Sequence, residues 1–253
     1  MGRLFGTDGA RGIANSELTC ELAMNIGKAA AMVLLDSETS DKPTILIGKD
    51  TRISSDMLEG ALTAGLCSVG ANVVQLGTVP TPAVAYLVRR YNANAGIMIS
   101  ASHNPHEFNG IKIFNSDGYK LPDALEEKIE SIVIDNEIPY PVPVGSDLGK
   151  VTSLPKAVDD YIDHIVSSVD GDLKGLKIAV DCSNGSASAT AEKLFTKLGA
   201  DFTIINDKPD GININERCGS THMEELMEYV KSSDVDCGVA FDGDADRCLA
   251  VDE

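Results

Sequence analysis

The sequence repeats one order of elements in its two halves, and this repeat limits the fold more than any other feature. Each half contains a short, continuously apolar run typical of a strand buried on both faces, then a helical stretch and two further strands. The matching strands are TILIG (44–48) and LKIAVD (176–181), NVVQLG (72–77) and DFTIIN (201–206), and GIMIS (96–100) and GVAF (238–241). Strands that alternate with helices indicate α/β architecture, so we expect two related α/β units in tandem.

The remaining pattern predicts helices around these strands and a break between the halves. Apolar residues at helical spacing predict helices at 18–34, 56–69, 81–91, 121–134 and within 183–200, and IKIF (111–114) predicts a further strand. Thr19 is a candidate N-cap for the first helix. The stretch IPYPVPVG (138–145) holds three prolines, which keeps it out of a central strand. We therefore expect one domain over residues 1–150 and a second over 151–253.

Composition limits the partners and the compartment of the chain. With 253 residues, 43% of them hydrophobic, the chain can bury a substantial core. Its 39 acidic and 21 basic residues give a net charge of −18, which disfavours binding to nucleic acid or to an anionic membrane. The six cysteines form no C-x-x-C pair, and neither a secretory leader nor an apolar stretch of about 18 residues occurs. We expect a cytoplasmic protein with reduced thiols.

Each half also places a polar loop directly after its third strand. The first loop is ASHNPHEFNG (101–110), which runs into IKIF, and the second is DGDADR (242–247), which runs into CLAV (248–251). In open α/β sheets, ligands bind beyond the carboxyl ends of the strands. Both loops therefore lie where a functional site is expected.

The second loop has the composition of a metal site. Asp242, Asp244 and Asp246 alternate with small residues, and in an extended segment this spacing turns all three carboxylates to one side. Hard oxygen ligands in small number suit Mg²⁺, with substrate oxygens and water completing the coordination. Two other interpretations are a solvated acidic turn and a haloacid-dehalogenase-type loop with Asp242 as nucleophile, although that pattern has Thr or Val where Asp246 stands.

The first loop offers a nucleophile or phosphate carrier. Ser102 is followed by His103 and by Asn104-Pro105, which predict a turn that holds the hydroxyl at its tip. A phosphoserine there would be a phosphoryl donor if cations held its oxygens, and His103 could act as an acid or base or position the loop. Five cations lie in loops or beside strands where they could do so: Arg11, Lys49, Arg52, Lys112 and Arg247.

Three motifs in this order, GTDGARG (6–12), SASHNP (100–105) with NGIKIF (109–114), and DGDADR, closely resemble the α-D-phosphohexomutase superfamily. The resemblance implies two tandem three-layer α/β domains with mixed sheets, the first half of a four-domain architecture. It implies that Ser102 carries the transferable phosphate, and that Asp242, Asp244 and Asp246 bind one Mg²⁺ together with a phosphoserine oxygen. It places Arg11, Lys112 and Arg247 around the transferring group, with Lys112 or a neighbour taking the hydroxyl proton.

The family reaction moves phosphate between the 6- and 1-hydroxyls of a hexosamine or hexose through a 1,6-bisphosphate, which also serves as activator. The resemblance thus implies a hexosamine phosphate as substrate and a place in amino-sugar nucleotide and cell-wall precursor synthesis, with glucose or mannose phosphate as alternatives. The family's sugar-recognising and distal phosphate-binding loops are not found in this sequence. We therefore expect an N-terminal fragment with little turnover that exposes apolar surface and self-associates. A non-catalytic, metal-dependent binding module is the alternative from another class.

Overall fold

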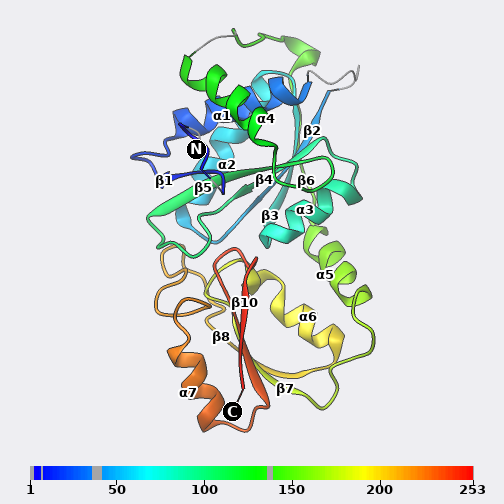
Figure 1. Cartoon of the computed structure of the whole chain (residues 1–253). Coiled ribbons are helices and arrows are strands. Elements are labelled where there is room, and N and C mark those ends of the chain that lie inside the picture. Colours follow the sequence, from blue (N-terminus) through cyan, green and yellow to red (C-terminus); the bar gives the residue numbers. More distant parts are fainter. Residues whose placement is uncertain (1–2, 7, 36–41, 136–138, 253) are drawn as a thin grey trace.

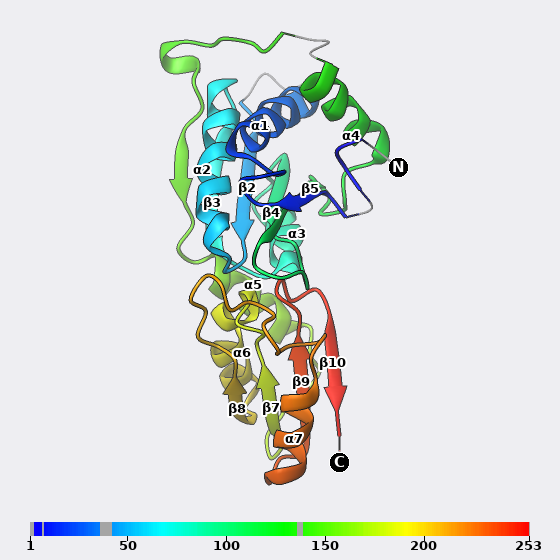
Figure 2. The same cartoon turned by 90° about the vertical axis from the view of Figure 1, so that its left-hand side faces the viewer.

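The computed structural model describes residues 3–6, 8–35, 42–135 and 139–252. Thr7 of GTDGARG and Ile138 of the proline-rich stretch therefore lie outside the described residues. The chain forms two mixed sheets with helices on both faces, stacked end to end along the long axis of the molecule (Figures 1 and 2). This arrangement confirms the expected pair of α/β domains with mixed sheets.

The first sheet has six strands in the order β1-β5-β4-β2-β3-β6. Strand β2 pairs in parallel with β3 and β4, β3 pairs in parallel with β6, and β5 runs antiparallel to β4 and β1. The strands are β1 (Ala10–Ile13), β2 (Thr44–Lys49), β3 (Asn72–Thr78), β4 (Ala95–Ile99), β5 (Phe108–Asn115) and β6 (Val151–Ser153).

Helices cover both faces of this sheet, which explains why its central strands are continuously apolar. On β2, Ile45 and Ile47 belong to one core cluster with the first two helices, whereas Leu46 between them belongs to a second cluster with the third and fifth. Leu22 N–H donates to Thr19 Oγ1 over 3.1 Å, so Thr19 is the N-cap that the sequence predicts. The helices are α1 (Cys20–Leu35), α2 (Ile53–Ser68), α3 (Thr81–Arg90), α4 (Asp123–Glu130) continued by a π turn (Ser131–Asp135), and α5 (Ala157–Ser167).

The contact between α1 and α2 depends on glycine. A Cβ at Gly65 would lie 2.2 Å from the carbonyl oxygen of Met24, whereas a Cβ at Gly60 on the same helix would meet nothing within 4 Å. We expect Gly65→Ala to lower the free energy of unfolding by about 1–3 kcal/mol through overpacking. Gly60→Ala should raise it by about 0.5–1 kcal/mol, because alanine is the better helix former. Urea unfolding of the two variants checks this, and equal midpoints would contradict it.

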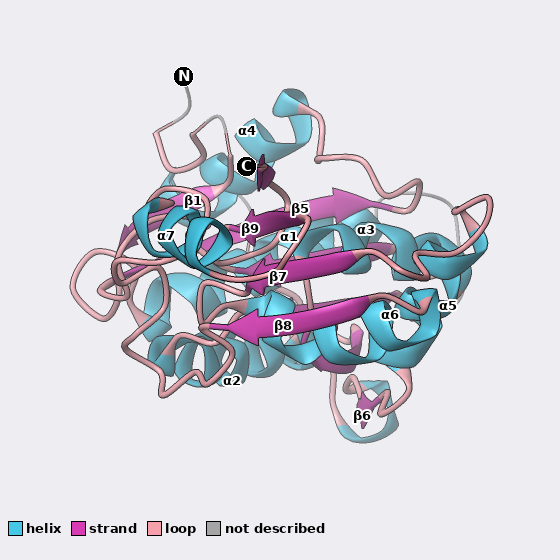
Figure 3. Ribbon diagram, turned by 90° about the horizontal axis from the view of Figure 1, so that it is seen from below, coloured by secondary structure: helices cyan, strands magenta, loops and turns pink. Residues whose placement is uncertain are grey.

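The second sheet has four strands in the order β10-β9-β7-β8 (Figure 2), and Figure 3 shows β9, β7 and β8 along the sheet. Strand β7 pairs in parallel with β8 and β9, and β10 runs antiparallel to β9. Ile178 and Val180 share a core cluster with α6, whereas Ala179 packs with α7 on the opposite face. The elements are β7 (Lys177–Asp181), a 3-10 turn (Ser186–Ala189), α6 (Ala191–Leu198), β8 (Asp201–Ile205), α7 (Glu224–Ser232), β9 (Cys237–Phe241) and β10 (Cys248–Val251).

The two sheets share a four-stranded core with one topology. The order β5-β4-β2-β3 in the first corresponds to β10-β9-β7-β8 in the second, so the serine loop and the aspartate loop join equivalent strands. The second domain differs from the sequence prediction in one detail: a 3-10 turn precedes α6, where the sequence predicts a single helix.

Strand β6 (151–153) lies in the first sheet, just beyond the expected domain boundary, and the division between residues 150 and 151 stays a prediction. Leu249 on edge strand β10 is half exposed, and self-association also stays a prediction.

Candidate active site

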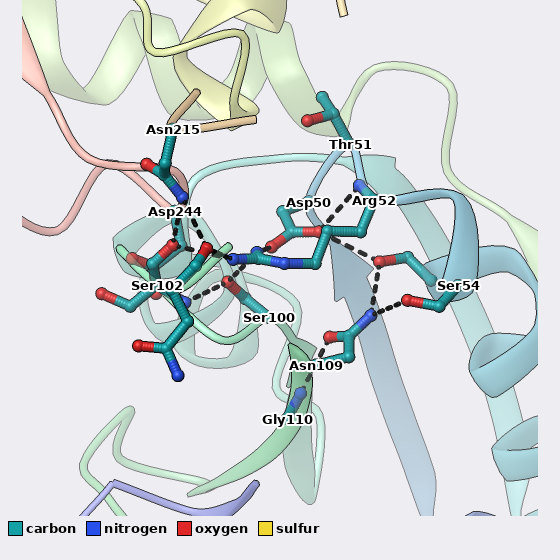
Figure 4. Close-up of polar contacts among 12 residues, drawn as sticks. Asp50, Thr51, Arg52, Ser54, Ser100, Ser102, Asn109, Gly110, Asn215 and Asp244 are labelled. Carbon is teal, nitrogen blue, oxygen red and sulfur yellow. Dashed lines mark hydrogen bonds and ion pairs between the residues drawn. The ribbon is translucent and has the colours of Figure 1, made fainter. Parts of the chain in front are cut away.

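The serine loop and the aspartate loop meet where the two domains face each other. Ser102 Oγ donates to Asp242 Oδ2 over 2.6 Å, although the two residues lie 140 positions apart in the chain. Both side chains are fully buried. The repeat predicted only that each loop follows the third strand of its own unit, and the end-to-end stacking of the domains brings the two loops together (Figures 1 and 4).

Ser102 is held in an unusual backbone conformation. Its φ is 54°, in the left-handed region, which costs of the order of 1–3 kcal/mol for a residue other than glycine. Ser102 N–H donates to Ser100 Oγ over 2.9 Å, and Asn104 N–H donates to the carbonyl of Ala101. The turn forms where Asn104-Pro105 predicts it, but the serine hydroxyl is buried against the aspartates and does not lie at an exposed tip.

The three aspartates offer ligand atoms that all lie within 4.8 Å of one another. The predicted cluster exists, but the predicted reason for it is wrong. Residues 242–247 form a turn in which Ala245 has a φ of 53° and its N–H donates to the carbonyl of Asp242, so the segment is not extended. The reversal of the chain, and not strand periodicity, gathers the carboxylates.

Asp244 is fixed by two donors on one oxygen and is free on the other. Its Oδ2 accepts from Thr81 Oγ1 over 2.7 Å and from Lys112 Nζ over 2.9 Å. Its Oδ1 is buried and has no hydrogen-bond partner among the described residues. A buried carboxylate oxygen without a donor is costly unless a cation binds it, so this donor set fits a divalent metal ion such as Mg²⁺.

Burial and mutual repulsion separate the protonation behaviour of the carboxyl groups. Burial, and next to it the charge of Asp244, raise the pKa of Asp242 to about 6. Burial also acts to raise the pKa of Asp244, but the charge of Lys112 and the hydrogen bonds to this carboxylate together outweigh it, and the pKa falls below the ordinary value. Burial and the charge of Asp244 raise the pKa of Asp246. Below about pH 6, and with no cation bound, one proton is therefore held mainly on Asp242.

These shifts predict opposite effects of pH on metal affinity and on stability. A metal ion must displace the proton from Asp242, so Mg²⁺ affinity should fall about tenfold for each pH unit below about 6. In the folded chain the pKa of Asp242 lies above the ordinary 3.8. This group therefore contributes to the stability of the metal-free fold at low pH, and its contribution is lost as the pH rises from 3.8 through about 6. Calorimetric titrations between pH 5 and pH 7.5 check the first effect. A constant affinity would contradict it.

Lys112 and Arg11 come from neighbouring strands on the same face. Arg11 on β1 lies opposite Gly110 on β5, and Lys112 follows two residues later, so their side chains leave the same face of the sheet. Asp8 joins them, because it accepts from Arg11 and lies 3.2 Å from Lys112 Nζ. Burial acts to lower the pKa of Lys112, but Asp244, Asp8 and Asp246 outweigh it and raise the pKa. Lys112 is therefore a charged group in this arrangement.

Arg247 and His103 lie on the more open side of the cluster. Arg247 Nη1 donates to His103 Nδ1 over 3.0 Å, which joins the two loops a second time. Burial, followed by the charges of Arg247 and Arg11, lowers the pKa of His103, so its ring is neutral near pH 7. An open cavity of about 580 Å³ adjoins His103 and is lined also by His106, Asn215, Arg217 and His222.

The two remaining candidate cations have different positions. Lys49 Nζ lies 2.6 Å from Asp56 Oδ1 and also contacts Glu59, so its described ion pairs are with α2 and not with the serine loop. Arg52 is buried, pairs with Asp50, and donates to the carbonyl oxygens of Ser102 and Asn104. It therefore supports the serine loop from its backbone side.

Sequence reasoning missed three residues that hold this site. Asp8 lies close to Arg11 in GTDGARG, and Thr81 is the first residue of α3, just after β3. Both could therefore have been found at the sheet edge where the loops lie. Asn215 donates to the carbonyl oxygens of Ser102 and Asn104 from an irregular segment of the second domain. No pattern in that segment singles it out.

Comparison with known proteins assigns the family. The model for phosphoglucomutase/phosphomannomutase α/β/α domain I matches residues 2–138, and the model for domain II of the same proteins matches residues 159–253. The chain therefore belongs to the phosphoglucomutase/phosphomannomutase family, as the three motifs predict. A phosphoglucosamine mutase of Acetivibrio thermocellus is 61% identical over the whole chain, and one of Clostridium beijerinckii is 60% identical.

The match covers only part of each of these proteins. The chain spans 56% of the length of both curated relatives. A crystal structure of a phosphoglucomutase/phosphomannomutase family protein from Burkholderia thailandensis superimposes with a TM-score of 0.83 at 25% identity, over 98% of this chain and 54% of that one. Among the described residues, no helix has the length and apolar character needed to cross a bilayer.

Proposed function

We propose that this chain supplies the phosphate-carrying and metal-binding parts of a phosphoglucosamine mutase active site. The whole reaction would interconvert glucosamine 6-phosphate and glucosamine 1-phosphate through a phosphoserine and a 1,6-bisphosphate. The observation that carries the proposal is the buried contact of Ser102 Oγ with Asp242, beside a buried oxygen of Asp244 for which no described residue is a donor. The choice of glucosamine rests on the relatives of that name at 58–61% identity.

The residues around Ser102 suit phosphoryl transfer, which depends mainly on positioning and on charge. In the step, the bond between Ser102 Oγ and phosphorus breaks while a sugar hydroxyl oxygen bonds to phosphorus, and the hydroxyl proton ends on Ser102 Oγ. Arg11, Lys112 and Arg247 would balance the charge on the phosphoryl oxygens. Asp242, Asp244 and Asp246 would hold Mg²⁺, which when bound supplies further positive charge at those oxygens.

Protonation states narrow the role of each group. A general base needs a free lone pair, and the raised pKa of Lys112 keeps its ammonium charged, so Lys112 serves better as a cation than as the base. Arg247 can only donate, so His103 Nδ1 accepts and Nε2 carries the proton of the neutral ring. In the proposed reaction, His103 Nε2 would donate to a phosphoryl oxygen. The aspartate carboxylates then remain as the groups through which the hydroxyl proton can pass.

The proposal is tested by loading the chain with phosphate within the full-length protein, where the parts of the relatives beyond this chain are also present. Incubation with Mg²⁺ and a hexosamine 1,6-bisphosphate should add one phosphoryl group, seen by intact-mass measurement and located at Ser102 by peptide mapping. Ser102→Ala should gain none, because the acceptor oxygen is gone, whereas Ser100→Ala retains that oxygen and should still gain one. A wild-type chain that gains no phosphate under any loading condition would contradict the donor role. It would favour the metal-dependent binding module, provided that Mg²⁺ still binds.

A further inference from the structure

Two side chains from different domains hold the same two carbonyl oxygens of the serine loop. Arg52 Nη2 donates to Ser102 O over 3.1 Å and to Asn104 O over 2.6 Å. Asn215 Nδ2 donates to the same oxygens over 2.9 Å and 3.0 Å. In Figure 4, Asn215 lies above Ser102 and the Arg52 side chain reaches toward it from the right. A carbonyl oxygen accepts two hydrogen bonds, so each one is saturated by this pair.

Arg52 is the donor from the first domain, and its side chain is fixed by its own contacts there. Its side chain is fully buried, and its guanidinium pairs with Asp50, which in turn accepts from Ser55 Oγ over 3.0 Å and from the Arg52 N–H. All of these groups belong to the first domain, like the serine loop itself. Arg52 therefore fixes the loop to its own domain and gives no information about the position of the second.

Asn215 is the half that comes from the second domain, and its orientation is set there. Its Nδ2 must face the loop, because two carbonyl oxygens can only accept, and its Oδ1 accepts from Ser183 Oγ over 2.7 Å. Asn215 N–H donates to the carbonyl of Ser183 over 2.9 Å, and the φ of Asn215 is 59°. The amide therefore cannot turn without losing three side-chain hydrogen bonds.

The aspartate loop meets the same point. A Cβ at Gly243, between Asp242 and Asp244, would lie 2.7 Å from Ser102 O and 2.8 Å from Asn215 Nδ2. Glycine is thus what lets the aspartate loop approach the carbonyl that Asn215 holds. The serine loop, the aspartate loop and Asn215 therefore meet at Ser102 O.

We propose that Asn215 is a positioning residue that sets Ser102 Oγ against the three aspartates across the domain boundary. Among the described residues it makes no hydrogen bond to the carboxylates or to the proposed phosphate ligands, and it acts through the backbone of Ser102 and Asn104. Its effect on phosphoryl transfer rests on the proposed function. Its effect on the order of the serine loop does not, and the two can be measured separately.

The first measurement is hydrogen exchange of the amides at residues 101–104, which needs no activity. Asn215→Ala and the isosteric Asn215→Asp both remove the two donors, and we expect exchange about tenfold faster there. Ser183→Ala removes only the group that orients the amide, and should act in the same direction with a smaller effect. Asn92→Ala is the matched control, because Asn92 is exposed and has a similar φ of 50°.

The second measurement is the rate at which Ser102 takes phosphate from the hexosamine 1,6-bisphosphate with Mg²⁺. Asn215→Asp should lower the maximal rate about 10- to 100-fold and leave the half-saturating bisphosphate concentration unchanged, since a small displacement of the acceptor affects the step and not the binding. A smaller folded fraction would also lower the maximal rate at an unchanged half-saturating concentration, so rates are compared per folded molecule, with the folded fraction taken from urea unfolding of each variant.

The outcomes are distinct. Unchanged exchange at residues 101–104 in folded Asn215→Asp would overturn the positioning role, as would faster exchange with an unchanged rate of phosphate uptake. If Asn215→Ala does not fold, Asn215→Asp and Ser183→Ala decide. If the wild-type chain takes no phosphate, the proposed function fails, whereas the exchange measurement still decides whether Asn215 holds the loop.

Discussion

Replacing Asp244 with Asn is expected to weaken Mg²⁺ binding by at least about 100-fold, more than the loss of a supporting residue around a metal normally does. Asp244 is the carboxylate with a lowered pKa, so it is charged at any pH where the site works. It also presents the buried Oδ1 that has no donor among the described residues. The substitution removes this charge while keeping the size of the side chain, and Thr81 can still donate to the amide oxygen.

Titration calorimetry of the wild type and of Asp244→Asn measures the effect directly. Asp170→Asn is the control, because it removes the same charge from an exposed carboxylate outside the cluster and should leave the affinity within about twofold, given the screening of exposed charges by salt. An Asp244→Asn variant that binds Mg²⁺ as tightly as the wild type would remove the metal assignment. Loss of affinity in both variants would instead indicate a general effect of net charge.

The meeting of the two loops illustrates how far the sequence predicts this site. The repeated order of strands placed Ser102 and the aspartates after equivalent strands, and the carboxyl ends of parallel strands are where ligands bind. The end-to-end stacking of the domains could not be predicted from the sequence, because it depends on contacts such as the hydrogen bond from Thr51 Oγ1 to the carbonyl of Asn184. Such contacts come from loops without periodicity.

Lys49 and Arg52 illustrate a second limit. They are three residues apart, Lys49 as the last residue of β2 and Arg52 in the loop after it, and composition alone does not distinguish their roles. The difference arises from α2, whose Asp56 and Glu59 take Lys49, while Asp50 turns Arg52 inward under the serine loop. Pairing between side chains from separate elements decides such cases, and hydrophobic periodicity carries no information about it. The turn that gathers the aspartates was missed for a similar reason, since a non-glycine residue with positive φ, Ala245, has no strong sequence signal.

Arg52→Met is expected to be the most destabilising of the substitutions considered, at about 3–5 kcal/mol, because it leaves Asp50 as a buried carboxylate without its counter-charge. Both side chains of the pair are 0% exposed. The same variant also removes a donor from the carbonyl oxygens of Ser102 and Asn104, so the loss should exceed that of the ion pair alone. Urea unfolding of the variant and of the wild type measures this loss of stability.

Two further variants show whether the buried charge is the cause. Lys197→Met removes the partner of Asp163 in a pair whose side chains are 45% and 64% exposed, and should cost no more than about 1 kcal/mol. Adding Asp50→Asn to Arg52→Met removes the unpaired carboxylate and should restore part of the lost stability. If the double variant were no more stable than Arg52→Met, the cost would lie in the lost support of the serine loop. Arg52 would then matter chiefly as a donor to that loop, the role it shares with Asn215.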